Sequence, residues 1–365
     1  MAASDMSSLV PHNEIVKAAR LVKQRAPLEI VELPDPAPAP DEVIVQIDAE
    51  GICRTDWHVW NGDWGWVGMT PDLPLVLGHE LGGTVVATGS DVRGVAEGDR
   101  VTVPFHEACG RCRYCLVGRS NLCERLQFIG LTHDGGYAQF AAIRNADFNV
   151  VHLPGSVDAL SAAAIGCRYM TAFHAVVHRG ALSPGQWVVV HGSGGVGLSA
   201  VQIAAALGGR VIAVDLAPAK LAKARDEGAE HTVDASSQDV VAAVRGITGG
   251  GAHLAIGGIG VAALVNNAVL ALRKGGRLVQ VGLTSQAEQG YVPLALDHLI
   301  ENEIEIRGSV GNPHVAYPEL LGLVERGVLR PKTIVGETVA LEQAGDVLGA
   351  MDRYDTLGFT VVTSF

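Results

Sequence analysis

The feature that most constrains the fold is a glycine-rich turn between two apolar segments. Residues 187–191 read WVVVH, residues 192–197 read GSGGVG, and residues 198–208 read LSAVQIAAALG. The first segment is typical of a buried strand and the third of a helix, and RVIAVD at 210–215 is a further strand. This order predicts a βαβ unit, and therefore an α/β fold with a parallel sheet.

The turn also has the spacing of a dinucleotide site. Gly192, Gly194 and Gly197 form G-x-G-x-x-G, with Gly195 and Val196 between the last two. The first glycine allows the tight turn, the second lets backbone approach a pyrophosphate, and the third lets the helix pack on the strand. The phosphates then lie at the helix N-terminus. A purely structural glycine loop is the alternative.

The end of the next predicted strand indicates which dinucleotide binds. Asp215 stands there, where a carboxylate accepts hydrogen bonds from ribose hydroxyls and repels a 2′-phosphate. The residues that follow, Leu216 to Pro218, include no arginine for such a phosphate, although Lys220 is close enough to reach the ribose. NAD is therefore favoured over NADP.

The chain of 365 residues is long for one core, and two domains are expected. Residues 16–150 contain short alternating runs and predict an antiparallel β lobe. Helices are predicted at 218–229, 239–247, 263–274 and 292–301, alternating with strands, for about six parallel strands in all. After residue 308 come a helix near 319–326 and a strand-like 358–365 that resembles the first lobe. The predicted domains are 1–159 with 308–365, and 160–307.

Charge and hydropathy exclude several classes of partner. The net charge is −12 and the 27 basic residues are scattered, which disfavours nucleic acid and anionic membranes. Residues 1–14 lack a positive start followed by an apolar run, and no stretch reaches the ~18 apolar residues of a membrane span. We expect a cytoplasmic protein with reduced thiols and a small, uncharged substrate.

The six cysteines divide into two groups. Four have the spacing C-x2-C-x2-C-x7-C, which predicts a closed, structural zinc site; a disulfide framework or a rubredoxin-like redox site are the alternatives. Cys53 and Cys167 stand apart, and with His79 they form a set of two thiols and one imidazole, which leaves a fourth zinc position open. Singly, each would more often be a core residue. The four clustered cysteines are Cys109, Cys112, Cys115 and Cys123.

These motifs together resemble the zinc-dependent medium-chain dehydrogenase/reductases over nearly the whole chain. Residues 78–92 match the family's zinc signature G-H-E-x2-G-x5-G-x2-V, and the four-cysteine segment and the glycine turn follow in the expected order. The resemblance implies a GroES-like β-rich catalytic domain plus a Rossmann-fold doubly wound parallel sheet. It also implies Cys53, His79 and Cys167 as catalytic zinc ligands, Glu80 as a group that approaches the metal, and a structural zinc lobe at about 105–125.

The resemblance implies an NAD-dependent alcohol dehydrogenase with two zinc ions, acting as a homodimer or homotetramer. A bound zinc lowers the pKa of a hydroxyl, as it lowers that of water to ~7, and hydride can then pass to the nicotinamide. Thr55 and His58 match a proton relay, although His58 also fits a plain surface imidazole. Matches to cofactor contacts are Arg54 for the pyrophosphate and, for the nicotinamide, Thr171, Val281, Gly282 and Leu283.

Four tryptophans between 57 and 66 predict an aromatic substrate pocket, unless two or three of them are core. Trp64 and Phe105 match pocket positions of the family, which favours alcohols with apolar substituents. The glycines at 257, 258 and 260 depart from the family's acidic and polar residues. The alternatives are a polyol or amino-alcohol dehydrogenase, a zinc-free quinone reductase, which lacks these ligands, and a non-catalytic NAD-binding structural protein.

Overall fold

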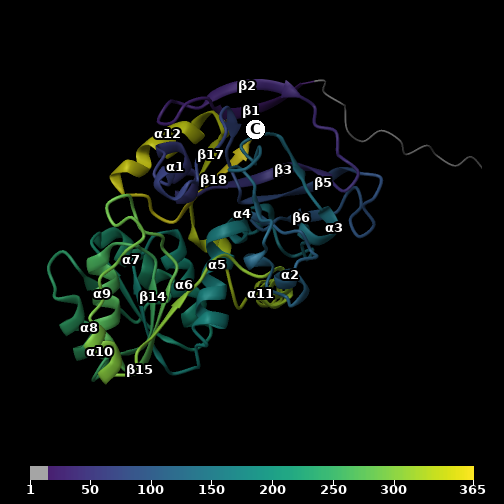
Figure 1. Ribbon diagram of the computed structural model, residues 1–365. Coiled ribbons are helices and arrows are strands. Elements are labelled where there is room, and N and C mark those ends of the chain that lie inside the picture. Colours follow the sequence, from purple (N-terminus) through teal and green to yellow (C-terminus); the bar gives the residue numbers. More distant parts are fainter. Residues whose placement is uncertain (1–14) are drawn as a thin grey trace, which may run out of the picture.

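The computed structural model describes residues 15–365, so the expectation for the N-terminal segment 1–14 lies outside the described residues. The described chain forms two lobes (Figure 1). The first lobe is β-rich, the second is a parallel sheet with helices, and the C-terminal strands return to the first lobe.

The second lobe contains a six-stranded, all-parallel sheet, as predicted. The first three strands are added toward one edge of the sheet and the last three toward the other, so the strand order reverses between β11 and β14. A doubly wound sheet binds its ligand at the carboxyl ends of the strands at this point. In sheet order the strands are β13 (His231–Asp234), β12 (Arg210–Asp215), β11 (Trp187–His191), β14 (Ala252–Gly257), β15 (Leu272–Gln280) and β16 (Glu305–Gly308).

The helices of this lobe follow the predicted alternation, with two differences. The helix expected at 292–301 begins only at Leu296, because Pro293 disfavours helical backbone at Val292 and its own carbonyl accepts from Asn266. The helix expected to reach residue 274 ends at Leu270, where β15 follows almost at once. The helices are α6 (Gly195–Ala206), α7 (Pro218–Asp226), α8 (Val240–Thr248), α9 (Ala262–Leu270) and α10 (Leu296–Glu301).

The first lobe is built on a seven-stranded sheet that is antiparallel except for one pair. Strands β17 and β18 run parallel, contrary to the prediction, because a crossover through α12 (Ala344–Ala350) joins them, and parallel neighbours need such a crossover. The strands are β10 (Val151–His152), β6 (Arg100–Thr102), β5 (Leu81–Thr88), β3 (Val43–Ile52), β18 (Phe359–Ser364) and β17 (Val335–Ala340), with β9 (Phe140–Ile143) also on β3.

Two small sheets and four short helices complete the first lobe. One sheet has three strands, and the other is a two-stranded pair that flanks the four clustered cysteines in the chain. The strands are β1 (Ile15–Leu21), β2 (Glu29–Pro34) and β4 (Leu75–Val76), and separately β7 (His106–Glu107) and β8 (Gln127–Phe128). The helices are α1 (Arg54–Asn61), α2 (Arg113–Leu116), α3 (Ala146–Asn149) and α11 (Tyr317–Glu325).

A long helical segment, 159–179, connects the two lobes. It consists of α4 (Ala159–Ala164) and α5 (Met170–Phe173), with π-helical turns at Ile165–Tyr169 and His174–Arg179. Contrary to the sequence-based expectation, this segment is long and apolar enough to cross a membrane, but 89% of its most apolar window is buried inside the protein. It is therefore part of the core, and it carries Cys167 into the region between the lobes.

Candidate active site and metal centres

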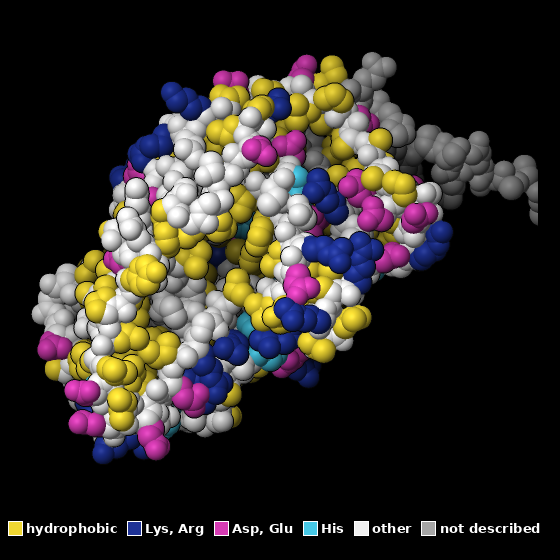
Figure 2. Space-filling model, viewed as in Figure 1, with side chains coloured by type: hydrophobic (Ala, Val, Ile, Leu, Met, Phe, Trp, Pro, Cys, Tyr) yellow, Lys and Arg dark blue, Asp and Glu magenta, His cyan; other side chains and the backbone are white. Residues whose placement is uncertain are grey.

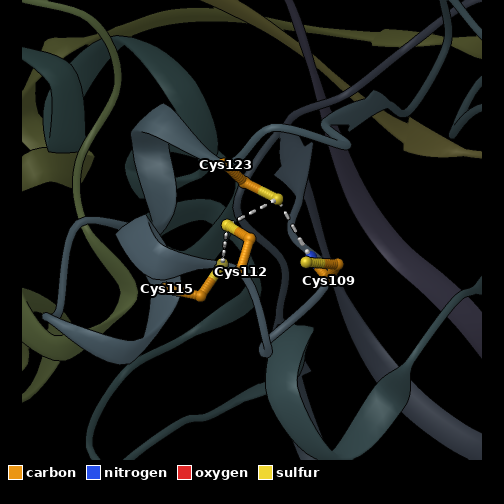
Figure 3. A group of neighbouring side chains, drawn as sticks. All are labelled: Cys109, Cys112, Cys115 and Cys123. Atoms are coloured by element: carbon orange, nitrogen blue, oxygen red, sulfur yellow. Dashed lines mark hydrogen bonds between the residues drawn. The ribbon is translucent and has the colours of Figure 1, made fainter.

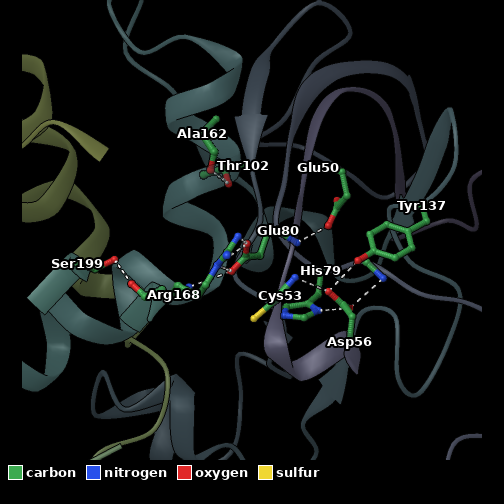
Figure 4. A network of polar contacts seen from close by, with 12 residues as sticks. Glu50, Cys53, Asp56, His79, Glu80, Thr102, Tyr137, Ala162, Arg168 and Ser199 are labelled. Carbon is green, nitrogen blue, oxygen red and sulfur yellow. Dashed lines mark hydrogen bonds and ion pairs between the residues drawn. The ribbon is translucent and has the colours of Figure 1, made fainter. Parts of the chain in front are cut away.

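Three ligand-type side chains from distant segments meet at one buried point, as Figure 4 shows in part. Cys53 follows β3 and caps α1, His79 lies in the turn before β5, and Cys167 lies in the first π-helical turn. Their ligand atoms and one carboxylate oxygen of Glu80 all lie within 4.8 Å of one another, and all four residues are buried. The structure thus brings together the set that the sequence predicts.

Asp56, which sequence analysis missed, orients this set. Its Oδ1 accepts from His79 Nδ1 at 2.9 Å, and its Oδ2 accepts from the Cys53 amide at 2.9 Å and from the Tyr137 hydroxyl at 3.0 Å. A carboxylate on the second ring nitrogen is the usual support of a metal-binding histidine. The available signal was the spacing Cys53-x-x-Asp56, in which the third helical residue bonds back to the cap.

The donor atoms fit zinc. His79 Nε2 is buried and has no hydrogen-bond partner among the described residues, because Asp56 holds the opposite nitrogen. A hydrogen bond between the two thiols lowers the pKa of Cys53 and raises that of Cys167, so Cys53 ionises first. Two sulfurs and one imidazole nitrogen are a known catalytic zinc set with a fourth position free.

Glu80 forms a buried ion pair with Arg168. The guanidinium Nε lies 2.9 and 3.0 Å from the two carboxylate oxygens, and Nη2 is also in contact with the carboxylate. Burial raises the pKa of Glu80 to about 7, although the positive charge of Arg168 opposes this shift. Glu80 is therefore held beside the ligand set by a partner that follows Cys167 directly in the chain.

Arg168 is the second residue that sequence analysis missed. Glycines make room for the pair: a Cβ on Gly51 would lie 2.2 Å from Glu80 Oε2, and one on Gly195 would lie 2.4 Å from Arg168 Cδ. The guanidinium stacks on the Phe359 ring at 3.8 Å and also lines the cleft of the glycine turn. An arginine directly after a metal ligand was the only sequence signal.

The cleft of about 360 Å³ lies at the carboxyl ends of the parallel strands, between the two lobes. Figure 2 shows a hollow at this position with apolar side chains around it. Among the residues that line the cleft are most of the predicted cofactor contacts: Arg54, Gly192, Gly194, Gly195, Asp215, Lys220, Gly282 and Leu283.

The glycine turn has the geometry that a phosphate site needs. Gly192 has φ +90°, which favours glycine, and a Cβ on Gly197 would lie 1.8 Å from the Gly192 carbonyl oxygen. Asp215 Oδ2 accepts from the Ser193 amide at 2.7 Å, which holds the carboxylate beside the turn. The α6 N-terminus therefore faces the cleft without side chains that would block it.

The glycines at 257, 258 and 260, where the family usually has acidic and polar residues, have a packing reason. A Cβ on Gly260 would lie 2.1 Å from the Leu283 carbonyl oxygen, and one on Gly282 would lie 2.6 Å from Gly258 backbone. The ends of β14 and β15 thus approach more closely than side chains would allow. Gly258, Gly260 and Gly282 all line the cleft, where backbone replaces side chains in its wall.

Other predicted residues lie around the cleft. Arg54 packs its guanidinium 3.5 Å from the Trp57 ring and 4.2 Å from the Tyr354 ring, and Lys220 Nζ donates to the Tyr354 carbonyl. His58 lines the cleft, with Nδ1 2.9 Å from Asp63 Oδ2. Thr55 lies on the first turn of α1.

Two predicted nicotinamide contacts, Thr171 and Val281, and two residues of the glycine turn, Val196 and Gly197, lie outside the cleft lining. Thr171 is buried, and its Oγ1 has no partner among the described residues. Val281 lines a second cavity that adjoins the cleft. Val196 packs against a core cluster to which both lobes contribute residues.

The two predicted substrate-pocket residues differ in position. Phe105 lies near the ligand set, with its ring 6.1 Å from the His79 ring. Trp64 is buried in a core cluster together with Trp57 and Trp60, and it stacks on His58 at 4.7 Å. The tryptophans line neither the cofactor cleft nor the second cavity that contains Val281, and three of the four rings belong to a core cluster.

The four remaining cysteines form a second group, shown in Figure 3. Their sulfurs lie within 4.8 Å of one another; Cys112 Sγ is 3.5 Å from Cys115 Sγ and 3.8 Å from Cys123 Sγ. A tetrahedral zinc with bonds of about 2.3 Å requires sulfurs about 3.8 Å apart. The Cys115 amide lowers the pKa of Cys112 to about 6, which favours a thiolate. This group fits a closed zinc site.

Comparisons with known proteins agree with this geometry. Residues 39–155 match the family model of the alcohol dehydrogenase GroES-like domain, and residues 195–326 match that of zinc-binding dehydrogenases. The chain is 35% identical to an alcohol dehydrogenase of Geobacillus stearothermophilus over 93% of this chain and 96% of that protein. It is 31% identical to an NAD-dependent alcohol dehydrogenase of Sulfurisphaera tokodaii over 95% of this chain and 99% of that protein.

A solved structure adds the fold. A zinc-binding dehydrogenase of Sinorhizobium meliloti, bound to NADP, superposes with a TM-score of 0.85 at 30% identity, covering 96% of this chain and 100% of that one. The fold and the metal-binding set define a zinc-binding dehydrogenase with a GroES-like domain and a Rossmann-like sheet. The chain belongs to the zinc-dependent alcohol dehydrogenases of the medium-chain dehydrogenase/reductase family. Its members interconvert an alcohol and its aldehyde or ketone by hydride transfer.

Proposed function

We propose that this enzyme oxidises alcohols with apolar substituents, using NAD, a catalytic zinc and a structural zinc. The observation that carries this proposal is the buried set of Cys53, His79 and Cys167 beside the glycine-turn cleft. When bound, zinc lowers the pKa of a coordinated hydroxyl and NAD accepts the hydride. Cys109, Cys112, Cys115 and Cys123 hold the structural zinc.

The residues around the catalytic set orient its ligands and exclude water. Asp56 fixes the tautomer of His79 by accepting from Nδ1, which leaves Nε2 for the metal. Glu80 stays close to the ligand atoms and can approach the metal, while Arg168 keeps the carboxylate compensated in a buried place. Asp56 and the Glu80–Arg168 ion pair hold the ligand side chains in place through hydrogen bonds, so the protein preorganises the site.

We assign the proton route to Thr55 and His58. Thr55 is two residues after Cys53, and His58 lines the cleft next to solvent. Burial lowers the pKa of His58, although Asp63 raises it in part, so the ring is neutral near pH 7 and can accept a proton. The Asp63 carboxylate then stabilises the protonated ring.

We assign cofactor binding to both sides of the cleft. The glycine turn, with Gly192, Gly194 and Gly195 at the wall, receives the pyrophosphate at the α6 N-terminus. Arg54 and Arg168 line the same cleft and supply positive charge from the first lobe and the connecting helix. Thr171, Val281, Gly282 and Leu283 are proposed to contact the nicotinamide.

Asp215 supports NAD over NADP. Its carboxylate lines the cleft and already accepts from the amides of Ser193, Leu216 and Ala217, so it is fixed and charged where the adenosine ribose would bind. Lys220 lines the same cleft, and its Nζ donates to the Tyr354 carbonyl oxygen. We expect Asp215→Gly to lower the ratio of kcat/KM with NAD to kcat/KM with NADP by about tenfold or more.

We further propose the domain bounds 1–159 with 308–365 and 160–307, a cytoplasmic location, and a homodimer or homotetramer. The sheet order supports the bounds, because β17 and β18 join the sheet of the first lobe. The exposed edge strand β16 of the parallel sheet supports pairing between subunits. All six cysteines are free thiols in the structure, which suits a reducing compartment.

Metal analysis and NADH formation test the proposed function together. The purified enzyme should contain two zinc ions per chain and form NADH with apolar primary or secondary alcohols. A polyol panel runs in parallel, because a polyol dehydrogenase is the nearest alternative. A folded, fully loaded enzyme with fewer than two zinc ions, or one that oxidises polyols only, contradicts the proposal.

A further inference from the structure

A second cavity, of about 730 Å³, adjoins the cofactor cleft. It lies where three parts of the chain meet: the zinc lobe near residues 119–122, the end of the connecting helix near 174–179, and the carboxyl edge of the parallel sheet at 280–283 and 308–310. It shares Gly282 and Leu283 with the cofactor cleft, so the two cavities meet at the proposed nicotinamide contacts.

The cavity is also close to the catalytic ligand set. Val310 lines it, and a Cβ on the next residue, Gly311, would lie 3.3 Å from the Phe105 ring, which faces His79. On the connecting helix, His174 lies seven residues after Cys167, or roughly 10 Å along the axis. The cavity therefore begins about one small-substrate length from the zinc ligands.

The cavity is cationic in an acidic protein. Arg119 and Arg179 line it, and the described lining contains no Asp or Glu, whereas the whole chain has a net charge of −12. Figure 2 shows Lys, Arg and His side chains gathered below and to the right of the hollow between the lobes. Glu319, on α11, is not part of the lining but lies beside it, with its Oε2 3.1 Å from Nε2 of the lining residue His178.

Arg119 and Arg179 both interact electrostatically with His174. Burial lowers the pKa of His174 to about 4, and His178, Arg179 and Arg119 lower it further by their charge. Arg179 Nε donates a hydrogen bond to the Gly308 carbonyl oxygen at 2.9 Å, which fixes the guanidinium at the cavity edge. Among the described residues, neither arginine has an acidic partner within ion-pair distance.

Neutral donors complete this wall. Ser309 lines the cavity, and its Oγ is buried without a hydrogen-bond partner in the described part of the chain. His174 is buried as well and shares one hydrogen bond with His178. Two guanidiniums with an unpartnered hydroxyl form a donor set that suits a carboxylate, whose oxygens accept from arginine forks.

We propose that this cavity binds a carboxylate of the substrate, so that the preferred substrates are hydroxy acids whose hydroxyl and carboxylate are separated by an apolar chain. The inference rests on the proposed alcohol dehydrogenase function and names its substrate class, which replaces the uncharged substrate expected from the net charge of −12. In the reaction the carbinol C–H bond breaks, its hydride reduces NAD⁺, and the hydroxyl proton leaves. The substrate becomes an aldehyde acid, and its carboxylate is unchanged.

The test compares matched substrates on the two-zinc holoenzyme. Unbranched ω-hydroxy acids, from hydroxybutanoate to hydroxydecanoate, are compared with the 1-alcohols of equal length, and NADH formation gives kcat/KM for each. We expect the acid to be preferred by about tenfold or more at the best length, since charge-assisted hydrogen bonds are strong. The preference should shrink as salt is raised, because the arginines are near solvent.

Three variants locate the effect. Arg119→Gln and Arg179→Gln should each lower the ratio of acid to alcohol by about fivefold to tenfold. Arg113→Gln is the matched control, because Arg113 is exposed on the same zinc lobe, pairs with Glu124 and lies outside the cavity. In this variant the ratio of kcat/KM for the acid to kcat/KM for the alcohol should stay at the wild-type value. If one arginine variant does not fold, the other gives the same reading.

The outcomes separate this inference from the proposed function. Oxidation of neutral alcohols with no preference for any acid overturns the carboxylate site and leaves the proposed function standing. Oxidation of neither series contradicts the proposed function itself. An equal drop in the ratio for Arg113→Gln assigns the preference to overall charge and also overturns the cavity proposal.

Discussion

The two cysteine groups of this protein differ in almost every physical respect. The four-cysteine group comes from one short stretch, Cys109–Cys123, whereas Cys53, His79 and Cys167 come from three distant segments; Cys109 is half-buried and all the other ligands of both groups are buried. In the first group backbone amides donate to sulfur, as those of Cys109 and Arg125 donate to Cys123 Sγ. In the second group a side chain, Asp56, accepts hydrogen bonds from His79 and from the Cys53 amide.

This difference shows what each metal contributes. The hydrophobic cluster at the four-cysteine group consists of Ala108 and three of the cysteines, so this lobe has little core without a metal. The second group is held by Asp56, Tyr137, Glu80 and Arg168, and large core clusters surround it. One metal therefore stabilises local structure, and the other acts on a structure that exists without it.

The largest expected effect is the loss of activity in Cys53→Ser. Removing one of three protein ligands should weaken zinc binding and lower kcat/KM by about a thousandfold or more, because zinc supplies several kcal/mol of charge stabilisation. The melting temperature should change by only a few degrees, since the surrounding network remains. Zinc analysis should give one ion per chain. If the melting temperature of Cys53→Ser falls as far as that of Cys112→Ser, a variant of the four-cysteine group, the division into a catalytic and a structural zinc site is wrong.

The matched variant is Cys112→Ser in the closed group. We expect unfolding to become easier by about 4 kcal/mol, because a structural zinc site contributes its binding energy to folding. Below the melting transition, kcat should stay within a few-fold of the wild type. Thermal unfolding and NADH formation at low temperature measure the two effects. A thousandfold loss of kcat in a still-folded variant assigns chemistry to this site and breaks the comparison.

Arg168→Gln tests how the buried site is supported. Glu80 would lose its buried partner, which should cost about 3 kcal/mol of stability, and NADH should bind about tenfold more weakly, since Arg168 also lines the cofactor cleft. Fluorescence titration with NADH measures the second effect without turnover. The double variant Glu80→Gln/Arg168→Gln should regain stability but not NADH affinity. Recovery of both would assign Arg168 to structure alone.

The sequence predicted this molecule best where a local pattern has one physical solution. The glycine turn, the alternating strands and helices and the Cys-x2-Cys spacing each depend on neighbours in the chain. Arg168 was missed because its pairing with Glu80 arises only when distant segments meet, and for Asp56 only the bond to Cys53 is local, whereas the bond to His79 forms in the fold. The parallel pair β17–β18 was missed for the same reason, as pairing direction follows the crossover through α12.

Residue type alone does not separate two interpretations of the tryptophan cluster. Trp57, Trp60 and Trp64 belong to a core cluster, as the alternative to a pocket expected, because large rings contribute most where burial is complete, and Trp64 as a pocket residue stays a prediction. The segment 159–179 was not recognised as an uninterrupted apolar helix, since Arg168 breaks its hydrophobic run; in the structure that arginine is neutralised by Glu80 inside the protein.

The smallest expected effect concerns the proton route at the edge of the buried site. His58→Gln should lower kcat by about tenfold, which is below the usual range for a general base because the histidine lies beside solvent that also accepts protons, and should remove the acidic limb of the pH profile. Burial lowers the pKa of His58, and the ring accepts a proton only when neutral. Wild-type activity should therefore fall as the pH drops through a value below 6.5, and stay constant above it. His152→Gln, at an exposed histidine paired with Asp99, is the control that should keep the acidic limb. An unchanged limb in His58→Gln would remove this histidine from the route, and the open site would then exchange protons directly with solvent.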